Sequence, residues 1–242
     1  LLNIQLAIMI YNRLGDAGMV MSLQNCLNIE DKALLGGQIA LLFCNYQLAQ
    51  DLFLSSSRPT AALDMRKNLR QWEQALKLAK VLNVHEIPEI CIKFGQQLEL
   101  RDDKENALKM FDDALHALDN EGNRVCPEHL VPIAMMGIAR GQIRVGNIKQ
   151  GIRMANELDD SQLFEDCGTI LEQQKQYSEA ASMFVKCKQY EKAALIYTKY
   201  LIKNDKGRIS EAAVIMDKVE NDALNSAFAK ACVAAGRYED AL

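Results

Sequence analysis

The chain has 242 residues, of which 49% are hydrophobic and 25% are charged, a globular composition that excludes disordered, collagenous and membrane-embedded classes. The formal net charge is −4, and no lysine- and arginine-rich cluster with interleaved aromatic residues is present, so we expect no nucleic-acid partner. Proline is scarce at 4 residues and aromatic residues make up 6%, a balance that favours helices over sheets.

The N-terminal residues do not resemble a signal peptide, because polar Asn3 and Gln5 follow the first two leucines closely. The first residue is not methionine and Tyr238–Leu242 lies inside an expected helix, so we expect a fragment of a longer chain. The longest uncharged run, Ala33–Gln50, contains too many glycine, asparagine and glutamine residues for a membrane span. We predict that this run is a buried solenoid helix and that the chain has no transmembrane segment.

Glycine and acidic or amide residues mark where the expected helices end and begin. Glycine after a helix supplies the left-handed cap, and aspartate, asparagine or serine caps the next helix. These signals occur at Leu14–Asp16, Ser55–Pro59, Leu100–Asp103, Val145–Asn147 and Ala235–Arg237.

Proline is a further start signal, because it fits the first turn of a helix. Pro59, Pro88 and Pro127 suit helix starts, whereas Pro132 is expected to kink or delay its helix. We expect about fifteen helices, no strand, and longer loops at Asp119–Arg124 and Lys203–Arg208.

One helical phrase occurs twice in tandem, at Lys175–Phe184 and Lys188–Tyr197. Each copy has an aromatic residue, two alanines three and four positions later, and a second aromatic residue at the seventh position, all on one helix face. A small alanine lets a neighbouring helix approach closely, and the aromatic residue fills the remaining gap. The predicted packing residues of the tandem are Tyr177, Ala180, Ala181, Phe184, Tyr190, Ala193, Ala194 and Tyr197.

Looser copies place further packing residues at Trp72 and Ala75 and at Ala107 and Phe111, with additional copies at Ile148–Ile152 and Tyr238–Leu242. The small residue stands at positions 75, 107, 151, 180, 193 and 241, at intervals of 32, 44, 29, 13 and 48 residues. A strict tetratricopeptide array would hold near 34. We therefore predict an all-α fold, an irregular tetratricopeptide-like α-solenoid of antiparallel helix pairs, forming one continuous segment over residues 1–242.

The seven cysteines are widely spaced and odd in number, unlike a secreted disulfide framework. We expect reduced, half-buried thiols in a cytoplasmic protein. They are Cys26, Cys44, Cys91, Cys126, Cys167, Cys187 and Cys232.

Residues for catalysis or metal binding are dispersed. No phosphate-binding glycine loop or Gly-x-Ser-x-Gly motif is present. His116 falls on the polar side of its helix, and Cys126 and His129 supply only one of the two ligand pairs that a structural zinc site normally needs. We predict no catalytic residue, no cofactor and no metal.

Paired acids and methionines have plain structural explanations. Asp102–Asp103, Asp112–Asp113 and Asp159–Asp160 fit helix ends or exposed faces better than an acid–base or cation site. Apolar spacing predicts that methionines fill the core, with a docking groove lined by Met19 and Met21 as the alternative. The methionines concerned are Met9, Met19, Met21, Met135, Met136 and Met154.

Several phrases resemble the WD-repeat protein 19 family, collinearly along nearly the whole chain. The resemblance is strongest over residues 11–79 and 166–197 and weakest over 119–130 and 202–219. The stretches that carry it are Tyr11–Gln24, Ala49–Arg66, Trp72–Ala79, Asp166–Glu172 and Gln176–Ala181.

The resemblance implies a segment of the tetratricopeptide-like tail that follows two β-propellers in a large subunit of intraflagellar transport complex A. It further implies scaffolding in retrograde ciliary transport and ciliary membrane-protein entry, and a location in the cytoplasm, the cilium and the ciliary base. Expected partners are other complex A subunits, with an indirect association with membrane cargo. The family provides no catalytic residue that could be transferred to this chain.

Three functional hypotheses follow. The first is a non-catalytic protein–protein interaction scaffold of the ciliary kind. The alternative is the helical solenoid of a coatomer-like vesicle-coat subunit, because such subunits also join propellers to irregular solenoids. The third, a helical enzyme, would require clustered titratable groups that the sequence does not show.

Overall fold

The structure, a computed structural model, describes residues 3–119, 121–202 and 208–235. By internal contacts the chain divides into two compact units. The first unit comprises residues 1–91 and 118–125, and the second comprises residues 92–117 and 126–242. The single continuous segment over residues 1–242 stays a prediction.

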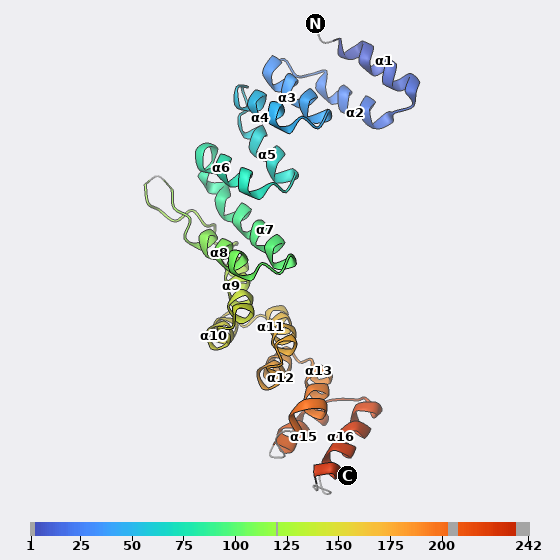
Figure 1. Ribbon diagram of the computed structural model, residues 1–242, viewed down its shortest axis with the longest axis vertical. Helices are drawn as coiled ribbons and strands as arrows, with labels where there is room; N and C mark the ends of the chain where they lie inside the picture. Colours follow the sequence, from blue (N-terminus) through green and yellow to red (C-terminus); the bar gives the residue numbers. More distant parts are fainter. Residues whose placement is uncertain (1–2, 120, 203–207, 236–242) are drawn as a thin grey trace. The chain divides into compact units, whose positions relative to one another are not determined.

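In the first unit, α1 packs on α2, α3 packs on α4, and α5 contacts both α4 and α6 (Figure 1). A 3-10 turn, η1, leads from α6 into α7, whose first residues belong to this unit. The elements are α1 (Ile4–Leu14), α2 (Ala17–Cys26), α3 (Lys32–Leu42), α4 (Tyr46–Leu54), α5 (Thr60–Asn68), α6 (Trp72–Leu82), η1 (Val84–Glu86) and α7 (Ile87–Leu100).

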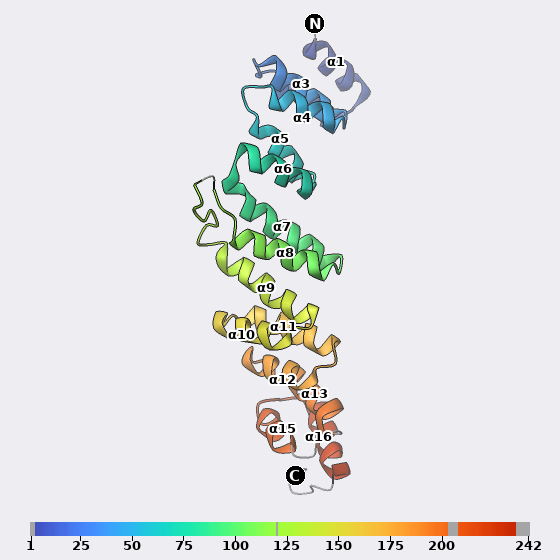
Figure 2. The same ribbon diagram turned by 60° about the vertical axis from the view of Figure 1, so that its left-hand side comes forward.

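The second unit continues in the same manner from the later residues of α7. Helix α9 packs on α8, α10 and α11, and α12 packs on both α11 and α13 (Figure 2). The elements are α8 (Lys104–Leu115), α9 (Val131–Val145), α10 (Ile148–Leu158), α11 (Ser161–Gln173), α12 (Tyr177–Lys186), α13 (Tyr190–Ile196), the π-helical η2 (Tyr197–Leu201), α15 (Ile209–Met216) and α16 (Asp222–Ala235).

The fold is all-α, and helices paired in sequence order make it an irregular α-solenoid, which confirms the predicted fold class. Within the described residues there is no β-strand, and extended pairing is limited to an isolated bridge between Leu118 and Arg124. The bridge pairs Leu118, which directly precedes the predicted Asp119–Arg124 loop, with Arg124, the last residue of that loop.

The prediction of one helix over Ala33–Gln50 is wrong. The run folds as two helices, α3 and α4, because Cys44 takes a left-handed backbone conformation with φ 59°. Asn45 then caps α4 by accepting a hydrogen bond from the backbone N–H of Leu48 at 3.3 Å.

Two predicted glycine turns are confirmed. Gly15 and Gly146 are left-handed, with φ of 76° and 103°. Elsewhere the same turn is made without glycine, at Cys44, Arg70, Asp102, Asp159, Lys175 and Lys188. Three predictions lie outside the described residues in whole or in part. The repeat copy at Tyr238–Leu242 lies wholly outside them. The turn at Ala235–Arg237 and the loop at Lys203–Arg208 are described only at Ala235 and Arg208.

The prolines agree only in part with expectation. Pro59 directly precedes α5, and Pro88 is the second residue of α7, as predicted. Pro127 does not begin a helix, because α9 starts at Val131. Pro132 occupies the first turn of α9 and therefore neither kinks nor delays it, since a first-turn N–H has no partner within the helix to lose.

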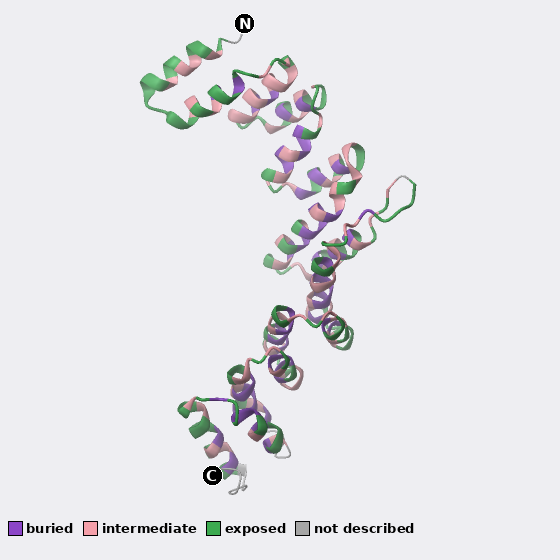
Figure 3. Ribbon diagram, turned by 180° about the vertical axis from the view of Figure 1, so that it is seen from behind, coloured by how far each residue is buried: buried purple, intermediate pink, exposed green. Residues whose placement is uncertain are grey.

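Burial follows the helix faces that meet one another (Figure 3). In the first unit, a core cluster contains Ala40, Ala49, Phe53, Ala61, Ala62 and Met65. In the second unit, a larger cluster runs from Ala139 through Phe164, Phe184 and Tyr197 to Cys232.

Two of the methionines expected in the core are not there. Met9 is 57% exposed and Met21 is 68% exposed, whereas Met19, Met135, Met136 and Met154 are half-buried. None of the seven cysteines forms a disulfide, but only Cys126 and Cys187 are half-buried, because Cys44 is exposed and the other four are buried.

Candidate functional site

The predicted packing residues lie at the junctions between helices. Trp72 and Tyr197 are buried, whereas Tyr177 and Tyr190 are half-buried. The remaining eight are almost completely inaccessible to solvent: Ala75, Ala107, Phe111, Ala180, Ala181, Phe184, Ala193 and Ala194. Their positions agree with a role in packing, and any direct role in binding stays a prediction.

Phenylalanine rings in the second helix of three pairs lie on glycines in the first helix. A Cβ atom added at Gly37 would lie 2.5 Å from the ring of Phe53, and one added at Gly168 would lie 3.0 Å from the ring of Phe184. Phe111 contacts Gly95 in the same way and also meets Gly137 on the following helix. These glycines therefore provide the space in which the rings pack.

The spacing in these three pairs is constant. Each glycine precedes its phenylalanine by 16 residues, and an alanine stands four residues before the ring, at Ala49, Ala107 and Ala180. Sequence reasoning identified the alanine at two of these positions but missed the glycine partner. The 16-residue spacing was the available signal, and it was hidden because the distance between successive copies varies.

The irregular intervals have a structural cause. Helix α12 packs against both α11 and α13, so it takes part in two successive junctions. Ala180 on α12 is buried at the first junction, and Ala193 on α13, 13 residues later, is buried at the second. At the α9–α10 junction glycine replaces alanine, because a Cβ at Gly151 would lie 2.5 Å from Cγ1 of Ile143 and 2.7 Å from the carbonyl oxygen of Ala139.

A chain of polar contacts links every second helix of the second unit, from α7 to α9, α11 and α13. Arg140 on α9 bonds Glu99 on α7 at 3.1 and 3.3 Å and lies 3.5 Å from Asp166 on α11. Arg144 contacts the same Glu99 carboxylate at 3.7 Å. We call these residues, together with Gln174, Glu165 and Lys192, the polar ladder.

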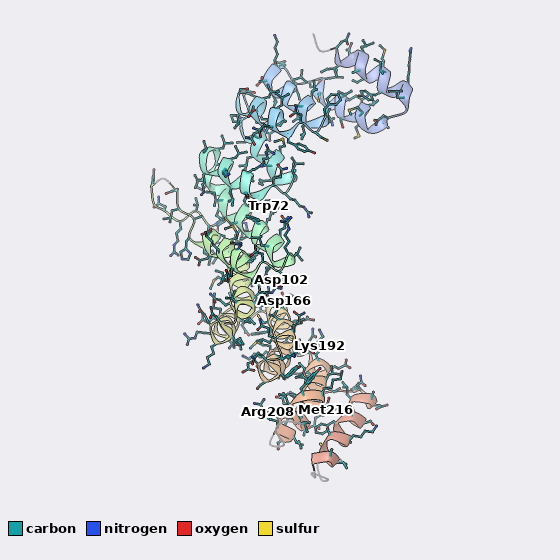
Figure 4. The ribbon with its side chains drawn as sticks, viewed as in Figure 1. Trp72, Asp102, Asp166, Lys192, Arg208 and Met216 are labelled. Atoms are coloured by element: carbon teal, nitrogen blue, oxygen red, sulfur yellow. The ribbon has the colours of Figure 1, made fainter. Side chains whose placement is uncertain are left out.

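The remaining contacts of the polar ladder reinforce the link between α9 and α11 and extend the ladder to α13. Gln174 donates to the carbonyl oxygens of Ile143 and Arg144 at the end of α9, at 2.9 and 3.3 Å. Lys192 on α13 bonds Glu165 on α11 at 2.8 Å, and this hydrogen bond lowers the pKa of Glu165. Figure 4 labels Asp166 and Lys192 on their helices.

Cys167 lies beside the polar ladder but is not a reactive thiol. It is fully buried, and burial raises the pKa of its thiol to about 12. A thiol with so high a pKa is protonated at neutral pH and is a poor nucleophile.

The first unit contains a buried arginine, Arg66, which sequence reasoning missed. Its side chain donates to the side-chain oxygens of Gln50 at 2.8 Å, Gln71, and Gln47 at 3.4 Å, and to the carbonyl oxygen of Tyr46 at 3.4 Å. Burial lowers the pKa of Arg66. These contacts join α4 and α5 to the start of α6.

The histidines and Cys126 do not converge. His116 is exposed, and its Nδ1 lies 3.0 Å from the carbonyl oxygen of Asp112 in the same helix. Burial raises the pKa of the Cys126 thiol. The part of the chain that the structure describes contains no group of three or more histidine, cysteine, aspartate or glutamate side chains able to hold a metal ion.

Helix α1 exposes an apolar face, and none of its residues is buried. Four large side chains at helical spacing are between 48% and 71% exposed: Leu6, Met9, Ile10 and Leu14. Exposed apolar faces of this kind are typical of surfaces that contact other proteins. The face is therefore a candidate interaction surface.

Comparison with known proteins identifies the relatives of the chain. No protein-family model matches it. WD repeat-containing protein 19 of Homo sapiens is 36% identical over 245 residues, which covers 100% of this chain and 17% of the human protein. Along its whole length, the chain matches a segment of the WD-repeat protein 19 family.

Two relatives from Caenorhabditis elegans extend the comparison. WD repeat-containing protein dyf-2 is 38% identical over 182 residues, covering 75% of this chain and 13% of the relative. Intraflagellar transport protein osm-1 is 27% identical over 192 residues, covering 73% of this chain and 11% of the relative.

These matches confirm the resemblance to the WD-repeat protein 19 family that the phrases from Tyr11–Gln24 onward indicate. The chain spans less than a fifth of the length of each of these relatives. Among the described residues, no helix is both long enough and apolar enough to cross a bilayer.

Proposed function

We propose that this chain is a non-catalytic, protein-binding scaffold segment of intraflagellar transport machinery. The observation that carries the proposal is its 36% identity, across the entire chain, to WD repeat-containing protein 19. The match to a protein named for intraflagellar transport, osm-1, supports the same assignment. A solenoid whose helices each pack only on near neighbours exposes extended helix faces, which suits binding to other proteins.

The proposed partners are the other subunits of intraflagellar transport complex A. In this proposal the chain acts in the cytoplasm, the cilium and the ciliary base, in retrograde transport and in the entry of ciliary membrane proteins. Any association with membrane cargo is indirect, through the partner subunits. The resemblance to the WD-repeat protein 19 family supports these finer assignments.

Neither competing hypothesis gains support. None of the relatives described above is named as a vesicle-coat subunit, so the coatomer-like alternative has no observation in its favour. An enzyme would need convergent titratable groups, and the buried Cys167, which has charged neighbours, has a raised pKa.

Binding of the purified chain to individually purified complex A subunits, followed by co-elution on gel filtration, tests the proposal. We expect at least one subunit to co-elute with the chain. Met9→Glu places a charge on the exposed α1 face, and Val81→Glu is a matched control at an 83% exposed valine of α6. If α1 is the contact, Met9→Glu should weaken binding about tenfold, which corresponds to roughly 1.4 kcal/mol, and Val81→Glu should not.

The two parts of the proposal have separate readouts. Equal binding by both variants would assign the contact to another face without affecting the scaffold role. Failure of every complex A subunit to bind the folded wild-type chain would contradict the proposed function.

A further inference from the structure

Arg140 is the branching point of the polar ladder, because its single guanidinium group contacts two other helices. Its Nε and one terminal nitrogen bond the two carboxylate oxygens of Glu99 on α7, at 3.3 and 3.1 Å. Its other terminal nitrogen lies 3.5 Å from Asp166 on α11. Arg140 itself belongs to α9, so one side chain connects α7, α9 and α11.

The charges at this branching point balance, since Arg140 and Arg144 face Glu99 and Asp166. The side chain of Arg140 is 17% exposed and that of Glu99 is 11% exposed, so solvent screens their interaction less than it screens a surface ion pair. A fork of two parallel N–H···O bonds also fixes direction as well as distance. The pair can therefore orient one helix relative to another.

The apolar contacts in the same region set how closely the helices approach. The ring of Phe111 lies between Gly95 of α7 and Gly137 of α9, which present no side chains to it. The missing Cβ atoms let the helices approach closely, and the shape of the packed ring limits the angles that the helices can adopt. The fork between Arg140 and Glu99 adds a directional polar restraint between α7 and α9 to this packing.

We propose that Arg140 is a shape-determining residue, which sets the spacing and mutual angle of α7, α9 and α11 through Glu99 and Asp166. Loss of its guanidinium group allows these helices to move apart while each remains folded. The inference goes beyond the proposed function, since it concerns the chain alone and requires no binding partner.

Distance measurement between spin labels on α7 and α11 tests this inference. Gln96 and Thr169 are exposed positions on the two helices, and labels attached through a genetically encoded ketone amino acid avoid the seven cysteines. The two helices flank α9, so the labels should lie on the order of 20 Å apart, given interaxial distances of 8–10 Å. Pulsed dipolar spectroscopy resolves distances of this size.

Arg140→Gln should lengthen the mean distance between the labels by more than about 1 Å and broaden its distribution. That shift exceeds the backbone movement of pre-organised proteins when they bind a partner. Arg153→Gln removes the same charge from an exposed position on α10 and should leave the distribution unchanged. Arg140→Lys keeps the charge without the fork and should give an intermediate shift.

Thermal unfolding of the same samples separates shape from stability. If Arg140→Gln and Arg140→Lys lower the melting temperature but leave the distance distribution equal to that of Arg153→Gln, the residue is merely stabilising and the inference is wrong. If Arg140→Gln does not fold, as judged by circular dichroism, Arg140→Lys decides the outcome by the same comparison. A shift in the distribution of the folded variant supports the inference.

Discussion

Phe184 lies against Gly168 so closely that a Cβ atom at the glycine would be 3.0 Å from the ring. The two residues are 16 positions apart, on α12 and α11, and the same relationship holds between Phe53 and Gly37. The relationship defines how the second helix of a pair meets the first. It also makes the energetic role of the glycines testable.

Gly37→Ala should destabilise the chain, although alanine is the better helix former. The new methyl group would lie 2.5 Å from the ring of Phe53, which is 1% exposed and cannot move aside freely. Overpacking of this kind costs about 1–3 kcal/mol, which outweighs the ~1 kcal/mol that the higher helix propensity of alanine contributes. Urea denaturation measures the difference.

The adjacent residue provides the control. A methyl group at Gly36 would lie 3.3 Å from the flexible end of Leu52, so Gly36→Ala should be neutral or stabilise by up to about 1 kcal/mol. Equal effects of the two substitutions would show that the Phe53–Gly37 contact does not control the packing.

Lys175→Gly should stabilise the chain. Lys175 forms the turn between α11 and α12 with φ 63°, a left-handed conformation that costs a side-chain-bearing residue roughly 1 kcal/mol. Lys109→Gly, on the exposed face in the middle of α8, should instead destabilise by about 1 kcal/mol. Thermal unfolding of both variants checks the opposite signs, and a loss of stability in Lys175→Gly would count against the turn geometry.

Asp31 should make part of the stability depend on pH. It caps α3 and also accepts a hydrogen bond from the backbone N–H of Ser57 at 2.6 Å. The hydrogen bonds from Ser57 lower the pKa of Asp31 to about 2, below its value of about 3.9 in unfolded chains. Its contribution is therefore fully present above the unfolded pKa and is lost as the pH falls through the folded pKa.

Asp31→Asn removes this titration while keeping an acceptable cap. The wild type should be more stable than the variant near pH 5, and the difference should shrink as the pH falls toward about 2. Ser57→Ala removes only the hydroxyl hydrogen bond to Asp31, so it should reduce the pH dependence of stability by less than Asp31→Asn does. Urea midpoints across this pH range measure the effect, and a difference that is constant with pH would refute the assignment.

Phe111→Ala should be among the more damaging single changes in the second unit. The ring is fully buried between Gly95 and Gly137, and neither glycine has a side chain that could fill the vacated space. Loss of a buried phenylalanine costs about 3–5 kcal/mol. His116→Ala, at an exposed residue of the same chain segment, should change the urea midpoint little, and comparable losses in the two variants would contradict the packing described.

Local patterns in the sequence predicted the local features of the fold. Glycine at positions 15 and 146 identified two turns, and the tandem phrase around Tyr177 and Tyr190 identified packing faces. The turn at Lys175 could not be predicted in the same way, because lysine carries no intrinsic preference for positive φ. The uncharged run Ala33–Gln50 concealed a turn for the same reason, since Cys44 occupies the left-handed position.

Features that depend on distant residues gave no local signal. Arg140 and Glu99 are 41 residues apart, so no local pattern pairs them. From the sequence, a single arginine on a helix face is indistinguishable from an ordinary exposed charge. Likewise, the exposure of Met9 depends on what packs against α1, which apolar spacing alone does not reveal. The Gly168–Phe184 relationship was visible as a constant spacing, but only once the helix pairs were known.

Side-chain footprinting of the chain, alone and with each purified complex A subunit, tests the central claim most directly. Hydroxyl radicals label exposed side chains such as Met9, Met21 and Phe43, which are 57%, 68% and 64% exposed. The scaffold account predicts that at least one subunit protects a contiguous set of exposed side chains on one group of helix faces. Identical labelling of the chain with and without every subunit would contradict it.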